Sequence, residues 1–144
     1  MSEIAKVWLD GLWCDSHSSQ TFTAINPSTG VPIGDQYPVS NWVDCERALA
    51  AADAVAQVLP DVPRDRIADF LERYATAIEL DAEALANLAH EETGLPVTPR
   101  LKDVELPRTV NQLRQAATAC REGSWSLPTI DSKAGIRSVH AAIG

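Results

Sequence analysis

The stretch Glu91-Glu92-Thr93-Gly94-Leu95-Pro96 decides where the helices in the second half of this 144-residue chain end and begin. Gly94 stands where a left-handed residue closes a helix, and any residue with a Cβ would cost roughly 1 kcal/mol there. Pro96 prevents the helix from resuming at once. Thr98 and Pro99 then supply an N-cap and a first-turn proline. The stretch therefore predicts one helix that ends before the glycine and another that begins after the threonine.

The helix after this break carries apolar residues on one face at helical spacing. They are Leu106, Val110, Leu113, Ala117 and Cys120, and Gly123 follows where the helix should end. Pro107 lies inside this pattern, where a proline removes a backbone hydrogen bond and clashes with the preceding turn. The sequence therefore predicts a kink, or two helices that meet near Val104.

Two helices are expected before the break. The first begins at Asn41, whose side chain can accept a hydrogen bond from the backbone N–H of Asp44, and it ends at Pro60. The second begins near Pro63, and Asp81 can cap its continuation. The apolar face of this second helix consists of Ile67, Phe70, Leu71, Tyr74 and Ile78.

Short strands are expected at both ends of the chain. Asp10-Gly11 is the two-residue signal for a type I′ turn, and Asn26-Pro27-Ser28-Thr29-Gly30 predicts a second hairpin. Near the end, Val139, Ala141 and Ile143 alternate within residues 135–144 and predict a strand. No turn or polar tail follows this strand, so the chain is interpreted as a fragment.

The order of these features resembles one known family. The 26–30 turn and the 91–96 break are followed by Pro107-Arg108-Thr109-Val110-Asn111-Gln112-Leu113-Arg114 and by Arg121-Glu122-Gly123-Ser124-Trp125. This order resembles the N-terminal quarter or third of NAD(P)-dependent aldehyde dehydrogenases. Within that superfamily the chain is similar to the α-ketoglutaric semialdehyde (2,5-dioxovalerate) dehydrogenases, although Pro107 and Val110 replace glycines expected in that branch.

The resemblance implies an α/β fold of the aldehyde dehydrogenase type. Residues 1–144 would form an N-terminal β-hairpin unit, three to four helices and a terminal strand. They would belong to the cofactor-binding domain and end where the oligomerisation and cofactor-fold strands begin. The parent protein is expected to use NAD or NADP to oxidise a small-molecule aldehyde, a semialdehyde acid such as 2,5-dioxovalerate, to the carboxylate. It is also expected to be a homo-oligomer, either a dimer or a tetramer.

Composition argues against several other classes of partner. Twelve Lys plus Arg against twenty Asp plus Glu give a formal charge of −8, which would repel a nucleic-acid backbone. No apolar stretch approaches the roughly 18 residues of a membrane span. The three cysteines are widely spaced with no Cys-x-x-Cys pair, which favours neither a disulfide framework nor a zinc site. We therefore expect a cytoplasmic protein that binds neither nucleic acid nor a membrane.

The family reaction needs a nucleophilic thiolate, an oxyanion hole, a carboxylate that activates water, and a nicotinamide ring. The resemblance places the segments that supply these groups beyond Gly144. No catalytic, cofactor-binding or metal-ligating residue is therefore assigned within the chain. Cys14, Cys45 and Cys120 are interpreted as small packing residues.

Arg108 and Gln112 are the candidate site residues. They are four positions apart and so share a helical face. The resemblance implies that this helix borders the tunnel through which aldehydes reach the thiol, where a guanidinium could bind the distal carboxylate of a semialdehyde acid. The structural alternative is a surface arginine paired with Glu105 or another acid.

A second interpretation comes from a different class of protein. The helices could form a stand-alone, non-enzymatic module that binds a protein partner through their exposed faces. The coding sequence downstream of Gly144 discriminates between the two interpretations. An open frame with a Cys-containing, Gly-rich segment favours the enzyme, and an immediate stop favours the module.

Overall fold

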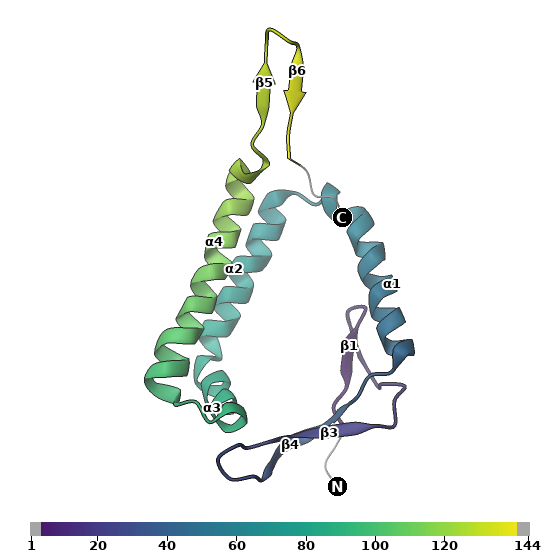
Figure 1. Ribbon diagram of the computed structural model, residues 1–144, viewed down its shortest axis with the longest axis vertical. Helices are drawn as coiled ribbons and strands as arrows, with labels where there is room; N and C mark the ends of the chain where they lie inside the picture. The colour runs from purple at the N-terminus through teal and green to yellow at the C-terminus, as the bar shows by residue number, and fades with distance from the viewer. Residues whose placement is uncertain (1–3, 141–144) are drawn as a thin grey trace.

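The computed structural model describes residues 4–140, and its ribbon traces an open frame (Figure 1). Two hairpins and α1 (Trp42–Val58) form one side of the frame. The other side consists of α2 (Arg64–Leu80) and α4 (Leu106–Glu122), which pack side by side, with α3 (Ala82–Thr93) at their base. The expected α/β class is confirmed, with hairpins and helices in the anticipated order.

The first hairpin joins β1 (Val7–Leu9) to β2 (Leu12–Cys14) in antiparallel register. Asp10 has a φ of 51° and Gly11 a φ of 75°, as the predicted type I′ turn requires. On this hairpin the rings of Trp8 and Trp13 pack edge to face with centroids 5.1 Å apart. The predicted first hairpin is therefore confirmed.

The second hairpin joins β3 (Thr21–Ile25) to β4 (Pro32–Pro38), also antiparallel. In its turn the Asn26 side chain accepts hydrogen bonds from the backbone N–H groups of Ser28 at 2.9 Å and Thr29 at 3.2 Å. Gly30 takes the left-handed conformation, with φ of 71°. The 26–30 turn therefore forms as its sequence predicts.

The first helix begins at the predicted cap. The side chain of Asn41 accepts a hydrogen bond from the backbone N–H of Asp44 at 3.2 Å. The helix ends at Val58 and tightens into a 3₁₀ turn, η1 (Leu59–Asp61), which contains Pro60. The helix α1 contacts mainly this turn and β1.

The helices α2 and α4 approach each other through small side chains. Ala68 and Ala75 of α2 and Val110 and Ala117 of α4 are buried. Phe70 and Tyr74 of α2 stack on each other instead, with 63% and 52% of their surfaces exposed. The expected single apolar face of α2 is therefore wrong in part. An alanine stripe, which lets the backbones approach, meets α4, and the aromatic pair lies outside that interface.

The continuation of α2 is separated from it at Asp81, which has φ of −99° and ψ of 11°. Asp81 makes no side-chain capping bond, so the predicted cap at this residue is wrong. The helix α3 ends at Gly94 with φ of 72°, as predicted. A Cβ on Gly94 would lie 3.4 Å from both Pro27 Cγ and Ser28 Oγ, so the end of α3 lies against the 26–30 turn.

The segment after this break does not begin with the predicted cap. Thr98 is extended, with φ of −116° and ψ of 134°, and makes no capping bond. The segment Val97–Glu105, η2, is π-helical apart from this extended residue and leads into α4 at Leu106. Pro107 therefore lies in the first turn of α4, where a proline is tolerated because no intrahelical donor is lost. The predicted junction of two helices near Val104 is confirmed.

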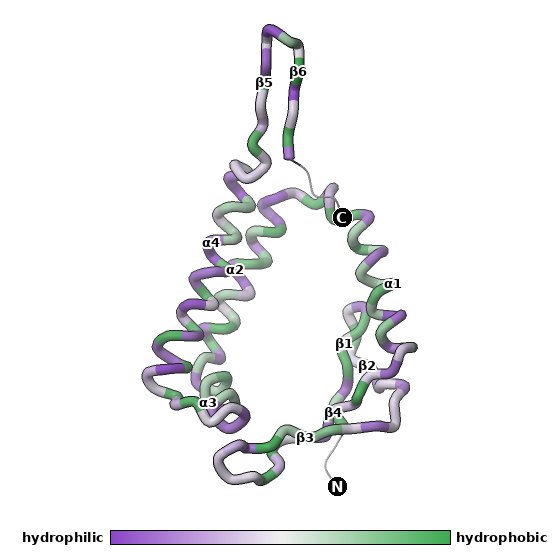
Figure 2. Tube along the Cα trace, in the orientation of Figure 1, coloured by the Kyte–Doolittle hydropathy of each residue, from purple (hydrophilic) through white to green (hydrophobic). Residues whose placement is uncertain are grey.

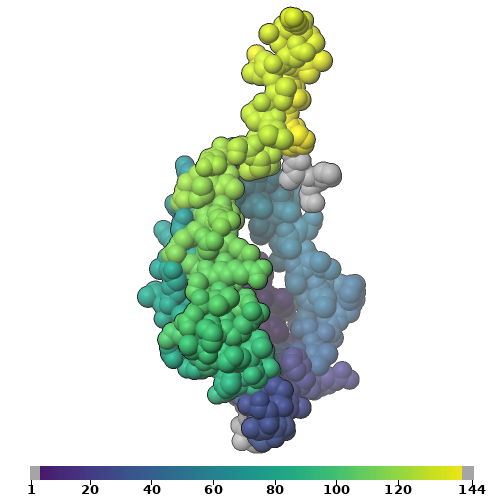
Figure 3. Space-filling model, turned by 60° about the vertical axis from the view of Figure 1, so that its left-hand side comes forward, coloured from purple at the N-terminus to yellow at the C-terminus, as the bar shows by residue number. Residues whose placement is uncertain are grey.

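After α4 and a 3₁₀ turn, η3 (Ser124–Ser126), a third hairpin projects from the frame (Figures 1 and 3). It joins β5 (Thr129–Asp131) to β6 (Ile136–Ser138). The strand β6 is therefore shorter than the strand predicted within residues 135–144. It pairs with β5, and the sequence did not predict this partner strand. Ala141 and Ile143, which contributed to that prediction, lie outside the described residues.

Little of the apolar side-chain surface is buried. The chain exposes 10936 Å², whereas a compact protein of 15.6 kDa exposes about 7,200 Å². Among residues 4–140, four of the six buried hydrophobic residues are alanines, and apolar segments are distributed along the open frame (Figure 2). Local turns, caps and helix–helix contacts therefore shape this fold more than a central core does.

Candidate substrate-recognition face

The helix α4 presents two different sides. Val110 and Ala117 are buried against α2, while Arg108, Gln112 and Gln115 are exposed. At about 100° per residue, these three polar residues lie on the opposite side of the helix from the buried pair. We call this exposed side, defined by Arg108, Asn111, Gln112 and Gln115, the outer face of α4. The structure thus places both predicted site residues on one face.

Ion pairs on the other side of α4 fix its position against α2. Arg114 donates two hydrogen bonds to the carboxylate of Glu79, at 2.8 and 2.6 Å. Arg121 donates to Asp69 at 2.9 Å and to Glu72 at 3.4 Å. The hydrogen bonds from Arg114 lower the pKa of Glu79, so the carboxylate form is favoured. These two arginines tie α4 to α2 and leave the outer face uncovered.

Arg108 lies near one carboxylate without a close hydrogen bond to it. Its Nη1 atom is 3.8 Å from Glu105 Oε2, and 67% of its side chain is exposed. A separation of 3.8 Å exceeds hydrogen-bond distance. Glu105 has a closer partner, because Arg100 Nη2 lies 2.6 Å from its Oε1 atom. Arg108 therefore lies near Glu105, as expected of a surface arginine paired with an acid. Its N–H donors also remain available to a ligand.

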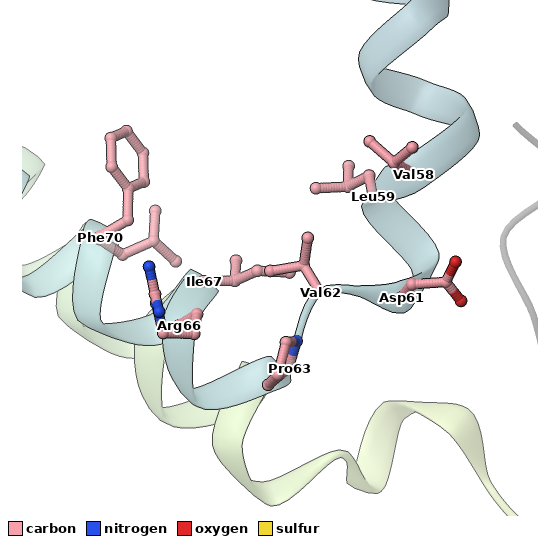
Figure 4. A pocket seen from close by; sticks show the side chains of 9 residues that line it. Val58, Leu59, Asp61, Val62, Pro63, Arg66, Ile67 and Phe70 are labelled. Carbon is pink, nitrogen blue, oxygen red and sulfur yellow. The ribbon is translucent and has the colours of Figure 1, made fainter.

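An apolar notch at the junction of α1 and α2 was not predicted. Val58 and Leu59 point across it toward the side chains of Val62 and Ile67 (Figure 4). Phe70 extends the same lining, and Arg66 supplies the cation at its edge. The helical spacing of apolar residues cannot predict such a notch, because the shape of the notch depends on the angle between α1 and α2.

A buried acid links the segment after the first hairpin to α1. Asp44 is 2% exposed and accepts hydrogen bonds from Ser16 Oγ at 2.6 Å and the His17 backbone N–H at 3.1 Å. His17 Nδ1 lies 2.7 Å from its other oxygen. These bonds, led by the one from Ser16, lower the pKa of Asp44. The serine binds the carboxylate and not the imidazole, so the cluster lacks the nucleophile–base contact of a hydrolytic triad.

This cluster was missed because its members are 28 and 27 residues apart. The position of the acid in the first turn of α1 is the only local signal, and a favourable charge at a helix start explains it equally well.

The three cysteines are all partly buried. Cys120 contacts the backbone carbonyl of Arg64, with 3.4 Å between sulfur and oxygen. Within residues 4–140, no group of three metal-ligating side chains comes together. In the same part of the chain, no helix is long and apolar enough to cross a lipid bilayer.

The residues described here do not fit a nicotinamide dinucleotide by themselves. Such cofactors bind at the carboxyl edge of a parallel sheet, over a glycine-rich turn that opens a helix. Within residues 4–140 the sheets are two-stranded and antiparallel, and Gly11, Gly30 and Gly135 lie in turns between strands. The chain therefore contributes no dinucleotide cradle of its own among these residues.

The sequence model of the aldehyde dehydrogenase family matches residues 13–144. The chain belongs to this family. Alpha-ketoglutaric semialdehyde dehydrogenase 2 of Azospirillum brasilense is 39% identical over 115 residues, covering 79% of this chain. Malonate-semialdehyde dehydrogenase 2 of Shouchella clausii is 27% identical and covers 87% of it. N-succinylglutamate 5-semialdehyde dehydrogenase of Burkholderia mallei is 28% identical and covers 93%.

Solved structures show the same fold. Aldehyde dehydrogenase C of Pseudomonas syringae superposes with a TM-score of 0.80 at 21% identity, over 89% of this chain and 26% of that one. The Mycobacterium tuberculosis aldehyde dehydrogenase gives a TM-score of 0.78 at 22% identity, over 91% and 27%. Both of those structures contain NAD+.

This aldehyde dehydrogenase chain spans about a quarter of the length of the relatives it matches. The share is 22% for the Azospirillum protein, 24% for the Shouchella protein and 27% for the Burkholderia protein. The expected resemblance to the family, including its α-ketoglutaric semialdehyde branch, is confirmed by these matches.

Proposed function

We propose that the full-length gene product carrying this chain oxidises an aldehyde to a carboxylate with NAD or NADP. Family membership supports the reaction class, and the two relatives of known structure described above contain NAD+. In this proposal the present residues form part of the scaffold of the cofactor-binding domain. The thiolate, the water-activating carboxylate and the cofactor cradle come from residues outside this chain.

We further propose that the substrate is a semialdehyde acid such as 2,5-dioxovalerate. The three relatives described above are named for α-ketoglutaric, malonate and N-succinylglutamate semialdehydes. A dicarboxylic semialdehyde carries a carboxylate at the end remote from the aldehyde. A cation that meets that carboxylate would favour such molecules over plain aldehydes.

Arg108 supplies that cation in this proposal, with Gln112 beside it on the outer face of α4. The exposed guanidinium, 3.8 Å from the nearest acid oxygen, is the observation that carries the assignment. A planar guanidinium can bind both oxygens of a carboxylate at once. The buried Val110 and Ala117 and the α2–α4 ion pairs join the helix to α2, so the outer face belongs to a packed helix and not to a loop.

The wider setting is proposed on the same basis. The full-length protein would be a cytoplasmic homo-oligomer, a dimer or tetramer, that binds a small-molecule aldehyde. The acidic composition, with a net charge of −8, disfavours nucleic acid as a partner.

The test is a substrate comparison with the full-length gene product. Its specificity constants would be measured for 2,5-dioxovalerate and for pentanal, a five-carbon aldehyde without a carboxylate, with NAD and with NADP. We expect a higher kcat/KM for the semialdehyde acid. Equal or reversed preference would contradict the substrate assignment, and no oxidation of either aldehyde would contradict the reaction class.

A second measurement concerns the 144-residue chain alone. We expect no aldehyde oxidation with either cofactor, because it lacks an assigned nucleophile and cofactor cradle. Turnover that is abolished when one of its three cysteines is alkylated would contradict this prediction.

A further inference from the structure

The chain changes from π-helical to α-helical hydrogen bonding at Glu105, where α4 begins. This change brings two arginines close to the carboxylate of Glu105. In the segment Val97–Glu105, the backbone N–H of Leu101 donates to Pro96 and that of Leu106 donates to Leu101, five residues back in each case, whereas α4 has the four-residue spacing of an α-helix. Before Glu105, residues five apart in sequence therefore lie on the same side of the helix, one turn apart. After Glu105, residues three or four apart lie in this way. Arg100 precedes Glu105 by five positions and Arg108 follows it by three.

The two arginines consequently approach one carboxylate from opposite directions along the helix. Arg100 Nη2 lies 2.6 Å from Oε1 of Glu105, and Arg108 Nη1 lies 3.8 Å from Oε2. Glu105 is the least exposed of the three, with 31% of its side chain accessible against 53% for Arg100 and 67% for Arg108. A regular α-helix would not bring residues 100 and 105 onto one face.

The two contacts are unequal. At 2.6 Å, Arg100 is a close counter-charge for Glu105 and restrains its side chain. At 3.8 Å, Arg108 is attracted to the same carboxylate without committing an N–H group to a hydrogen bond. The group of three carries a net positive charge, because two guanidinium groups face one carboxylate, and its most exposed member is the guanidinium of Arg108.

We propose that Glu105 is a positioning residue, which Arg100 holds in place and which keeps the guanidinium of Arg108 ready for the distal carboxylate of the substrate. This inference rests on the function proposed above. A flexible arginine loses side-chain freedom when it binds a ligand, and a nearby fixed carboxylate reduces that loss by restricting the side chain beforehand. Glu105 touches no reacting atom, so its effect is on substrate affinity.

The experiment uses the full-length gene product with Glu105→Gln, Arg100→Met, Arg108→Met and the double variant Glu105→Gln/Arg108→Met. Glu122→Gln, an exposed acid at the far end of the same helix, is the matched control. KM and kcat are measured for 2,5-dioxovalerate and pentanal. The dissociation constant of glutarate, an unreactive dicarboxylate, is measured by calorimetry as a readout that needs no turnover.

We expect Glu105→Gln and Arg100→Met to raise KM for 2,5-dioxovalerate and the dissociation constant of glutarate by about two- to fivefold, the range of exposed ion pairs. The values for pentanal and all kcat values should stay unchanged, as should every value for Glu122→Gln. The double variant should bind no more weakly than Arg108→Met alone, because Glu105 acts only through Arg108.

Unchanged or tighter glutarate binding in Glu105→Gln would overturn the inference, because Glu105 would then be neutral or competing with the ligand. Equal losses for pentanal and 2,5-dioxovalerate would also overturn it and assign Glu105 a purely structural role. If Arg108→Met discriminates between the two aldehydes and Glu105→Gln does not, only the positioning role fails. If Arg108→Met has no effect on either aldehyde, the proposed substrate recognition fails with it.

Discussion

At the scale of single residues, charged side chains in this chain act through specific partners. Arg114 and Arg121 each bind acids of α2, and Asp44 is enclosed by Ser16 and His17. Arg108 differs because its nearest acid lies beyond hydrogen-bond distance. Its uncommitted donors and its place on the outer face of α4, and not its charge alone, make it a recognition candidate.

Replacing Arg108 with alanine in the full-length gene product should separate recognition from folding. Losing one charge-assisted contact to the substrate carboxylate removes roughly 1.5–3 kcal/mol, or about one to two decades in kcat/KM for a semialdehyde acid. Pentanal has no carboxylate to lose, so its kcat/KM should barely change. Steady-state kinetics with both aldehydes gives the answer. Equal losses for both, or no loss for either, would return Arg108 to a surface residue paired with Glu105.

Asp44→Asn tests the link between α1 and the segment that follows the first hairpin. The pKa of Asp44 lies below its ordinary value of 3.8, chiefly because Ser16 donates to the carboxylate and His17 also binds it. Folding therefore favours the ionised form. The stability that ionised Asp44 adds to the folded protein is fully present above its unfolded pKa, near 3.8. This contribution is lost as pH falls through the pKa that Asp44 has in the folded protein, which is lower.

We expect the Asn variant to unfold at lower denaturant concentration than the original protein at neutral pH. The difference should stay constant down to about pH 5 and narrow below about pH 4, where Asp44 itself becomes protonated. Urea titrations across that pH range measure both. A difference that grows as pH falls would show that the carboxylate is not stabilised by folding.

At the scale of elements, two turns that are far apart in sequence meet. The glycine that closes α3 lies against Pro27 and Ser28, in the turn between β3 and β4. The helix end thereby joins the hairpin side of the frame to the α2–α4 side. Two of the stretches that carried the family resemblance thus form one contact.

Gly94→Ala should destabilise the protein by about 1 kcal/mol, because alanine at a φ of 72° is strained, while its Cβ would lie 3.4 Å from Pro27 Cγ, in van der Waals contact. Gly30→Ala is the matched control, since Gly30 has a φ of 71° and a Cβ added there would meet no atom within 4 Å. The stability of Gly30→Ala should fall only by the cost of the strained backbone. Chemical denaturation of both variants compares the two costs. Full stability of Gly94→Ala would refute the backbone strain expected at the end of α3.

At the scale of the whole molecule, the chain exposes about half as much surface again as a compact protein of its mass. Large apolar residues on several elements contribute to this excess, including Leu80 at 82%, Ile130 at 72% and Trp42 at 69% exposed. Such a surface needs covering by other protein, which agrees with the quarter-length coverage of its relatives.

The isolated chain should therefore self-associate at micromolar concentration. The exposed strands of the β5–β6 hairpin add unpaired backbone edges to the apolar surface. Sedimentation velocity on the chain and on the full-length gene product makes the comparison, and the latter should form a defined species. A compact, stable monomer of the isolated chain would instead favour the stand-alone helical module.

Local chemistry made much of this fold predictable from the sequence alone. Asp10-Gly11, Asn41 and Gly94 each specify their own backbone conformation, because a positive φ or a cap depends on the residue itself and its nearest neighbours. The order of these signals also indicated the family. Arg108 and Gln112 could be placed on a shared face, because helical spacing is fixed by the backbone.

Only the tertiary structure decided which faces are covered and which charges meet. Phe70 was expected beside Ile67 in one apolar face, but the alanines pack against α4 because small side chains allow two helices to approach closely. Asp44 meets Ser16 across 28 residues, and no local pattern encodes that distance. The π-helical spacing that brings Arg100 to Glu105 likewise depends on how the segment 97–105 packs between α3 and α4.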